Sequence, residues 1–257
     1  ANRSKEYSPA SLERTAYHEG GHALVALLTE GGSSIYKATI MPRGGALGYV
    51  SFTNDEETDS YSVTYKQYMA KLDTAMGGRV AEELIYGEEN ITSGASQDLL
   101  QATNIARMMV TRFGYGTSIG KMAVNQDMPV SPEVQARVDA EVQALLEGAY
   151  KRAKTLLTDN RVQLERLARG MLKYETVTSS EIQQLLRGEE LNREIVPIVV
   201  DNVRSPKREV EGDFVTSVGA GADGNGKKGE NGSSGSGKST LSKKAITQDS
   251  VDLMERA

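Results

Sequence analysis

Residues 17–23 of this 257-residue chain read Tyr-His-Glu-Gly-Gly-His-Ala, and they contain its two histidines, His18 and His22. Side chains four residues apart lie on one face of a helix, one turn from each other. Two imidazoles at this spacing can bind one zinc ion, and the glutamate after the first of them can accept a proton from a metal-bound water. We therefore interpret the stretch as a zinc site rather than as a solvated histidine pair.

The sequence around the motif predicts that it lies in the middle of a helix. The pair Ser8-Pro9 is typical of a helix start, and the glycines at 31–32 are typical of a helix end. Between them the apolar positions keep a helical period. Gly20 and Gly21 each cost about 1 kcal/mol relative to alanine inside a helix. That cost suggests a close approach by another backbone or side chain at this face.

The composition excludes several classes of protein. There are no cysteines, so a disulfide scaffold and a thiolate zinc site are both impossible. A formal net charge of -5 gives no reason to expect nucleic-acid binding. The sequence has no apolar run of about 18 residues, which a transmembrane helix would need. We expect membrane association only through segments outside this chain.

The chain up to about residue 190 has mainly helical periodicity, with two short strand candidates after the motif helix. Strands are expected at 36–41 and 47–52, and helices at 64–86, 97–113, from 132 onward, at 160–174 and after 179–180. The expected fold is mainly α. It has a small β element carrying the motif helix, a helical C-terminal part and a disordered tail.

We divide the chain into three parts. Residues 1–190 form the predicted domain, 191–202 are an arm of uncertain structure, and 203–257 are a tail rich in glycine, serine and lysine that we expect to be disordered. Within the tail, residues 232–239 match the phosphate-loop pattern G-x-x-x-x-G-K-S. A working phosphate loop joins a strand to a helix. Because low-complexity sequence surrounds this match, we interpret it as accidental.

A catalytic zinc site needs a third protein ligand. Here it must be a carboxylate, because the chain has no further histidine and no cysteine. Glu82 and Glu83 lie on the second predicted helix, and either could face the site. Asp98 lies in the first turn of the third predicted helix, where the helix dipole favours a carboxylate. An ordinary first-turn acidic residue explains Asp98 equally well, so the residues alone leave the third ligand open.

Four blocks of sequence, in this order and at similar spacing, resemble the peptidase domain of FtsH-type ATP-dependent zinc metalloproteases. They read Arg-Thr-Ala-Tyr-His-Glu-Gly-Gly-His-Ala at 14–23, Lys-Ala-Thr-Ile-Met-Pro-Arg-Gly at 37–44, Met-Gly-Gly-Arg-Val-Ala-Glu-Glu-Leu at 76–84 and Thr-Ser-Gly-Ala-Ser-Gln-Asp-Leu at 92–99. The resemblance runs from about residue 10 to about residue 190. The sequences at 85–87 and 174–176 are most similar to those of the mitochondrial i-AAA branch.

The resemblance implies a set of functional residues. Asp98 would be the third zinc ligand, beside His18 and His22. Glu19 would be the catalytic base, and Glu82 would be a supporting carboxylate near the metal rather than a ligand. One Zn²⁺ per chain would be the cofactor, and no residues would bind any other cofactor.

The resemblance also implies a function in protein quality control. The chain would be a zinc-dependent metalloendopeptidase that hydrolyses unfolded or membrane-extracted proteins as the proteolytic part of an ATP-dependent AAA protease. ATP would act only through an ATPase module outside this chain. The chain would join a homohexameric ring at the mitochondrial inner membrane, or at a bacterial or plastid membrane.

The alternative is a catalytically silent ring subunit that binds zinc or substrate without cleaving. The sequence departs from the family at Gly20, where alanine is usual.

The strand predicted at 47–52 has two interpretations. It could bind an extended substrate backbone by taking it up as an additional strand, which would make substrate choice broad. It could equally be an ordinary half-buried strand.

Overall fold

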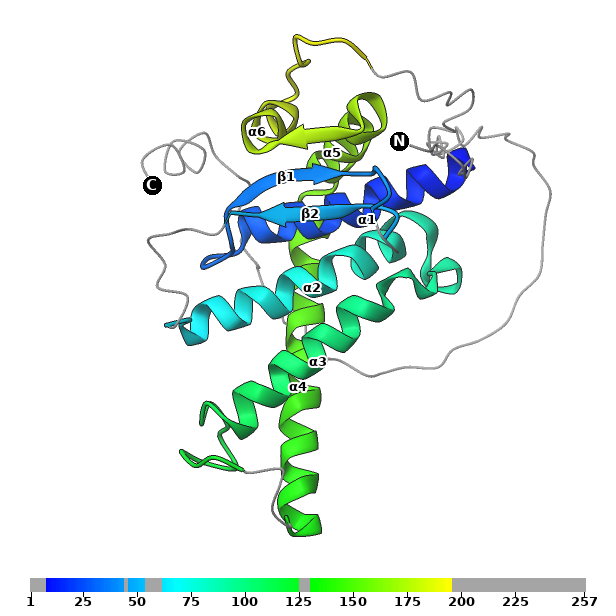
Figure 1. The fold of residues 1–257 in the computed structure, drawn as a ribbon. Helices are drawn as coiled ribbons and strands as arrows, with labels where there is room; N and C mark the ends of the chain where they lie inside the picture. Colours follow the sequence, from blue (N-terminus) through cyan, green and yellow to red (C-terminus); the bar gives the residue numbers. More distant parts are fainter. Residues whose placement is uncertain (1–7, 44–45, 54–61, 125–129, 196–257) are drawn as a thin grey trace, which may run out of the picture. The chain divides into compact units, whose positions relative to one another are not determined.

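The computed structural model of this chain describes residues 8–43, 46–53, 62–124 and 130–195 (Figure 1). The predicted tail at 203–257, with its phosphate-loop match, lies outside the described residues. So does most of the arm predicted at 191–202.

The described residues are mainly helical with one small sheet, which confirms the predicted fold class (Figure 1). The α-helices are α1 (Pro9–Leu28), α2 (Tyr65–Tyr86), α3 (Ser96–Thr111), α4 (Pro132–Asp159), α5 (Arg161–Tyr174) and α6 (Ser179–Arg187). The strands are β1 (Ile35–Thr39), β2 (Tyr49–Phe52) and β3 (Thr176–Thr178), and two 3-10 turns, η1 (Glu88–Asn90) and η2 (Ser93–Ala95), lie between α2 and α3. Each predicted helix is present, with ends close to those expected.

Serine–proline pairs explain where two of the helices begin. The Ser8 hydroxyl accepts the backbone N–H of Ser11 at 3.2 Å at the start of α1. The Ser131 hydroxyl accepts the N–H of Val134 at 3.3 Å at the start of α4. In both helices proline follows at the first helical position, where it removes a donor that would have no partner.

Three antiparallel strands form one sheet in the order β2-β1-β3. Ala38 of the central strand pairs with Val50 of β2 and with Val177 of β3. Ala38 and Val177 are fully buried, and β1 packs against α1 and α6. The sequence analysis predicted β1 and β2 but missed β3. A run of three residues between two helices is too short to show a strand period.

The backbones of α1 and α2 touch at a pair of glycines. A Cβ atom on Gly21 would lie 2.3 Å from the carbonyl oxygen of Gly77, and one on Gly77 would lie 2.6 Å from the carbonyl oxygen of Gly21. Gly20 faces α5 instead, where a Cβ would meet Leu164 Cδ1 at 3.4 Å and Met171 Cε at 3.5 Å, which is ordinary contact. The expected close approach is therefore confirmed for Gly21 and wrong for Gly20.

The core lies where α1, α4 and α5 meet the other elements (Figure 1). Leu164, Leu167 and Ala168 form the buried face of α5, which packs against α1. α4 packs against α2 and α3, with Val138 and Val142 buried in its first half. Within the described part of the chain, no helix is both long enough and apolar enough to cross a bilayer.

The two glycines of the motif should respond in opposite ways to alanine. We expect Gly20→Ala to stabilise the fold by about 0.4–1 kcal/mol, because the helix gains propensity and the methyl group has room. We expect Gly21→Ala to destabilise it by about 1–3 kcal/mol, because the methyl group would overlap the α2 backbone. Urea unfolding of the metal-free variants measures both. A destabilised Gly20→Ala or a tolerated Gly21→Ala would contradict this account of the packing.

Candidate metal centre

Helix α1 presents both histidines on one face, as the spacing predicts. The Nε2 atoms of His18 and His22 are 3.1 Å apart, and their ring centroids are 4.8 Å apart. Both rings lie in the interior, with 13% and 11% of their side-chain surfaces exposed. Two unprotonated ring nitrogens at this distance can share a metal ion.

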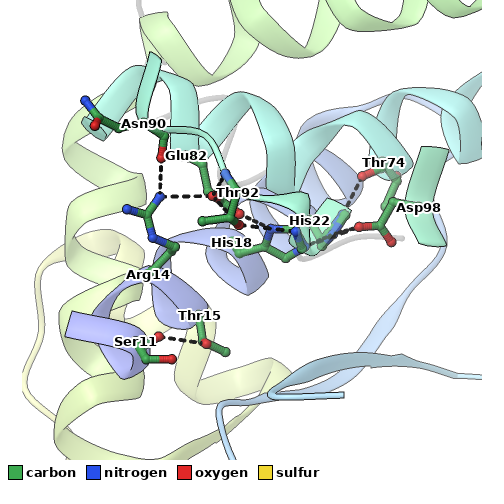
Figure 2. Close-up of polar contacts among 11 residues, drawn as sticks. Ser11, Arg14, Thr15, His18, His22, Thr74, Glu82, Asn90, Thr92 and Asp98 are labelled. Atoms are coloured by element: carbon green, nitrogen blue, oxygen red, sulfur yellow. Dashed lines mark hydrogen bonds and ion pairs between the residues drawn. The ribbon is translucent and has the colours of Figure 1, made fainter. Parts of the chain in front are cut away.

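Asp98 reaches the same point from the first turn of α3. Its Oδ2 atom lies 3.2 Å from His18 Nε2 and 3.3 Å from His22 Nε2. Figure 2 shows the two imidazoles of α1 and the carboxylate of α3 close together. Within the described residues, these three side chains form a cluster of potential metal-binding groups.

The geometry of the cluster fits a zinc ion. Zinc binds histidine nitrogen and carboxylate oxygen at about 2.0–2.2 Å, and tetrahedral coordination then places the ligand atoms about 3.3 Å apart. The three distances of 3.1–3.3 Å between Nε2, Nε2 and Oδ2 match this spacing. The residues present can therefore hold the ion with their Nε2 atoms and one carboxylate oxygen.

The other ring nitrogen of each histidine has a partner of its own. His18 Nδ1 lies 2.9 Å from Oε1 of Glu82, and His22 Nδ1 lies 2.7 Å from the carbonyl oxygen of Thr74 (Figure 2). Each Nδ1–H can donate to its acceptor, which leaves Nε2 as the lone-pair atom that faces the cluster. Because Glu82 lies on the Nδ1 side of the His18 ring, it cannot bind an ion held at Nε2.

Glu82 and Glu83 have different environments, which resolves a choice that the sequence left open. Glu82 is 1% exposed and faces His18. The Glu83 carboxylate accepts the Tyr150 hydroxyl at 2.5 Å and the Lys154 ammonium at 2.7 Å, and so ties α2 to α4. Glu83 therefore belongs to helix packing and not to the cluster.

The charges around the histidines favour a cation. Burial lowers the pKa of His18, but hydrogen bonds to Asp98 and Glu82 outweigh burial and raise it to about 9. Burial opposes ionisation of Asp98 too, yet its contacts with His18 and His22 hold the pKa of this carboxyl well below its usual range. The two charged carboxylates beside the His18 ring therefore favour positive charge there, either a proton or a metal cation, and the two compete for Nε2.

Glu19 differs from the other carboxyls because the effect of its burial outweighs the attraction of the two imidazoles. It is 7% exposed, and burial raises the pKa of its carboxyl. A Cβ on Gly48 would lie 2.8 Å from Glu19 Cγ, so the residue before β2 packs directly against this side chain. A carboxyl with a raised pKa next to a metal site is suited to accept a proton and pass it on.

Gly78 of α2 lies against the Nε2 atoms of both rings, on the side that faces the cluster. A Cβ atom at Gly78 would lie 2.5 Å from His18 Nε2 and 2.6 Å from His22 Nε2. The space beside the rings therefore exists because α2 has no side chain at this position. Neither Gly78 nor Thr74 was predicted from the sequence, and Thr74 acts through its backbone carbonyl, which leaves no side-chain signature.

The sequence is similar to known zinc metalloproteases. The profile of peptidase family M41 matches residues 5–185. The chain is 50% identical over 179 residues to ATP-dependent zinc metalloprotease FTSH 11, chloroplastic/mitochondrial, of Arabidopsis thaliana, a match that covers 70% of this chain and 22% of that protein. It is 44% identical over 189 residues to ATP-dependent zinc metalloprotease YME1L1 of Homo sapiens, covering 74% and 24% of the two chains.

A third relative is the mitochondrial inner membrane i-AAA protease supercomplex subunit YME1 of Saccharomyces cerevisiae. It is 43% identical over 185 residues, which cover 72% of this chain and 24% of that protein. The matched region is about a quarter of the length of each of these relatives.

The packing of Gly78 against the rings predicts the effect of adding one methyl group. We expect Gly78→Ala to weaken zinc binding about tenfold or more, because the methyl group would displace the imidazoles that converge on the ion. Competition with a chromophoric chelator measures the dissociation constant. Gly20→Ala is the matched control, since it makes the same change on a helix face turned away from the rings. Equal zinc affinity in the two variants would show that Gly78 does not shape the site.

Proposed function

We propose, because this chain belongs to peptidase family M41, that it is the zinc-dependent endopeptidase part of an ATP-dependent protease. The observation that carries the proposal is the triangle of His18 Nε2, His22 Nε2 and Asp98 Oδ2, with Glu19 beside it on the same helix. We propose these three residues as the metal ligands, one ion per chain, and Glu19 as the catalytic base.

A bound zinc ion would supply Lewis-acid chemistry, lowering the pKa of a water and polarising the scissile carbonyl. The chain's own residues fix where this happens. Glu82 and the Thr74 carbonyl orient the two imidazoles through their Nδ1 atoms. We propose Glu82 as the supporting carboxylate of this site.

Glu19 would carry the proton of the reaction. As the oxygen of water attacks the carbonyl carbon of the substrate, Glu19 accepts a proton from that water. It then donates this proton to the amine nitrogen as the C–N bond breaks, so that the carboxylate is regenerated. Burial raises the pKa of its carboxyl, which suits a group that must hold the proton between the two steps.

The start of β2 suggests how a polypeptide reaches these residues. β2 is an edge strand of the sheet, and Gly48 just before it packs on Glu19. An extended substrate that paired with β2 would pass beside the catalytic base. We propose this arrangement for unfolded polypeptides, because backbone pairing makes little demand on the substrate's side chains.

The names of the relatives support a proposal for the assembly and the location of this chain. Two of them are called ATP-dependent, and a third is named as a subunit of a mitochondrial inner membrane i-AAA supercomplex. We propose that this chain works in a ring, as a homohexamer with ATPase domains that unfold the substrate. We propose the mitochondrial inner membrane as its location, with a bacterial or plastid membrane as the alternative.

Two substitutions separate chemistry from metal binding. We expect Glu19→Gln to retain one zinc per chain but to lose peptide hydrolysis by at least about 100-fold, because the amide cannot accept the proton. We expect Asp98→Ala to lose zinc affinity, because only two ligands remain. Metal analysis and cleavage of an unstructured fluorogenic peptide measure both.

The same pair of variants tests the silent-subunit alternative. If the chain binds zinc and the Glu19→Gln substitution leaves its peptide hydrolysis unchanged, the chain does not use this site for catalysis. Unchanged zinc stoichiometry and affinity in Asp98→Ala would remove Asp98 from the ligands.

Backbone pairing with β2 predicts sensitivity to the substrate's N–H groups. We expect methylation at alternate backbone nitrogens near the scissile bond of a model peptide to weaken binding, since only every second N–H group of the added strand donates to β2. The KM of a series of singly methylated peptides, each compared with the unmethylated parent, measures the effect. Peptides that all bind as well as the parent would show that substrate does not add to the sheet.

A further inference from the structure

We propose that Arg14 and Thr92 are positioning residues for the metal centre: they fix Glu82 and the turn after α2 so that Asp98 is held at the histidines before any metal binds. The inference rests on the proposed zinc site but concerns residues that do not touch the ion. It is carried by the contacts of one buried carboxylate, by the reach of Arg14, and by the position of Thr92 in the chain.

The Glu82 carboxylate is the meeting point of three segments. Its Oε1 atom takes the hydrogen bond from His18 Nδ1 at 2.9 Å. Its Oε2 atom accepts Arg14 Nη1 at 3.1 Å, the Thr92 backbone N–H at 3.1 Å and the Thr92 hydroxyl at 3.0 Å (Figure 2). Since the carboxylate is 1% exposed, these donors replace the water that would otherwise hold it in place. A shift of Glu82 therefore moves both α1 and the segment before α3.

Arg14 lies one helical turn before His18 on α1 and reaches across to the end of α2. Besides Glu82, its Nη1 atom donates to the carbonyl oxygen of Asn90 at 2.8 Å. Its guanidinium carbon lies 4.2 Å from the centre of the Tyr86 ring, within range of a cation–π contact. Asn90 belongs to η1, the first turn of the connection between α2 and α3. One side chain thus ties the helix of the histidines to the segment that leads to Asp98.

Thr92 passes this constraint to Asp98. It is the N-cap of η2, where its hydroxyl oxygen accepts the Gly94 N–H at 3.2 Å. The same hydroxyl group donates its proton to Glu82. η2 runs directly into α3, whose first turn contains Asp98. The third ligand is therefore held through Thr92 by the same carboxylate that orients His18.

Loss of either residue should appear in metal affinity more than in stability. Without Arg14, the Asn90 carbonyl loses its hydrogen bond to α1, and Asn90 keeps its bonds to Tyr86 and Gly87. Without the Thr92 hydroxyl, η2 loses its cap and its bond to Glu82. In both cases Asp98 must be ordered when the ion binds. The entropic cost of that ordering makes the free energy of zinc binding less favourable.

The experiment uses the full chain with Zn²⁺ alone as the probe. Chelator competition measures the zinc dissociation constant, and thermal unfolding of the metal-free protein measures stability. We expect Arg14→Met and Thr92→Val each to weaken zinc binding by about tenfold or more, and Thr92→Ser, which keeps the hydroxyl, to restore it. Arg107→Met is the matched control. Arg107 also joins two helices through a 2.9 Å ion pair with Asp139, and its side chain is 34% exposed against 28% for Arg14.

A double-substitution cycle shows whether Thr92 acts through the third ligand. In an Asp98→Ala background, Thr92→Val should change zinc affinity much less than in the unsubstituted chain, because the part of its effect that acts through Asp98 is lost and only the part through Glu82 and His18 remains. A merely structural role would leave the effect of Thr92→Val unchanged in that background.

Several results would overturn the inference. Zinc affinity in Arg14→Met equal to that in Arg107→Met would do so, as would failure of Thr92→Ser to restore binding. Arg14→Met takes a donor from the buried Glu82, whereas Arg107→Met takes one from the half-exposed Asp139, so we expect a moderately lower unfolding temperature for metal-free Arg14→Met. Metal-free Arg14→Met that is already unfolded at the temperature of the zinc measurement would assign Arg14 to stability instead. If the unsubstituted chain binds no zinc, the proposed function itself fails and takes this inference with it, and that result is distinct from any of the others.

Discussion

The α1 and α2 backbones touch where Gly21 faces Gly77, and the candidate metal centre depends on that contact. Packed helices ordinarily lie 8–10 Å apart because side chains fill the space between them. Here a Cβ on either glycine would fall 2.3 or 2.6 Å from the opposite carbonyl oxygen. The backbone of α2 can therefore serve the site directly. The Thr74 carbonyl accepts from His22, and the bare Cα of Gly78 leaves room for both rings.

The three carboxyls around the histidines are kept in different states by their surroundings. Glu82 is buried but surrounded by donors, so hydrogen bonds from His18 and Thr92 outweigh burial and lower its pKa to about 2. Asp98 is held as the anion by the two imidazoles. Within the part of the chain that the structure describes, no hydrogen-bond donor lowers the pKa of Glu19, and burial raises it more than the imidazoles lower it. Environments that separate carboxyl pKa values in this way let one residue hold a structure together, one bind a cation and one transfer a proton.

Sequence reasoning located the parts of this structure that side chains determine. The helical spacing of His18 and His22, the serine–proline helix starts and the acidic first turn of α3 could all be predicted, because each depends on residue types at short range. β3 could not, since three residues show no period and the strand forms only because β1 lies beside it. The two motif glycines were indistinguishable in sequence, and only the position of α2 separates Gly20 from Gly21.

Asp98, the proposed third ligand, shows why such a site needs more than its motif. The histidines are one turn apart on a single helix, so the helix alone holds them in register. Asp98 comes from another helix across two short turns, and nothing local to Asp98 directs its carboxylate to the histidines. The direction is supplied by Glu82, whose two oxygens bind His18 on one side and Thr92 on the other. Because Glu82 meets His18 at Nδ1, it stays clear of the Nε2 side where Asp98 arrives, and one carboxylate can orient two ligands without competing for the ion.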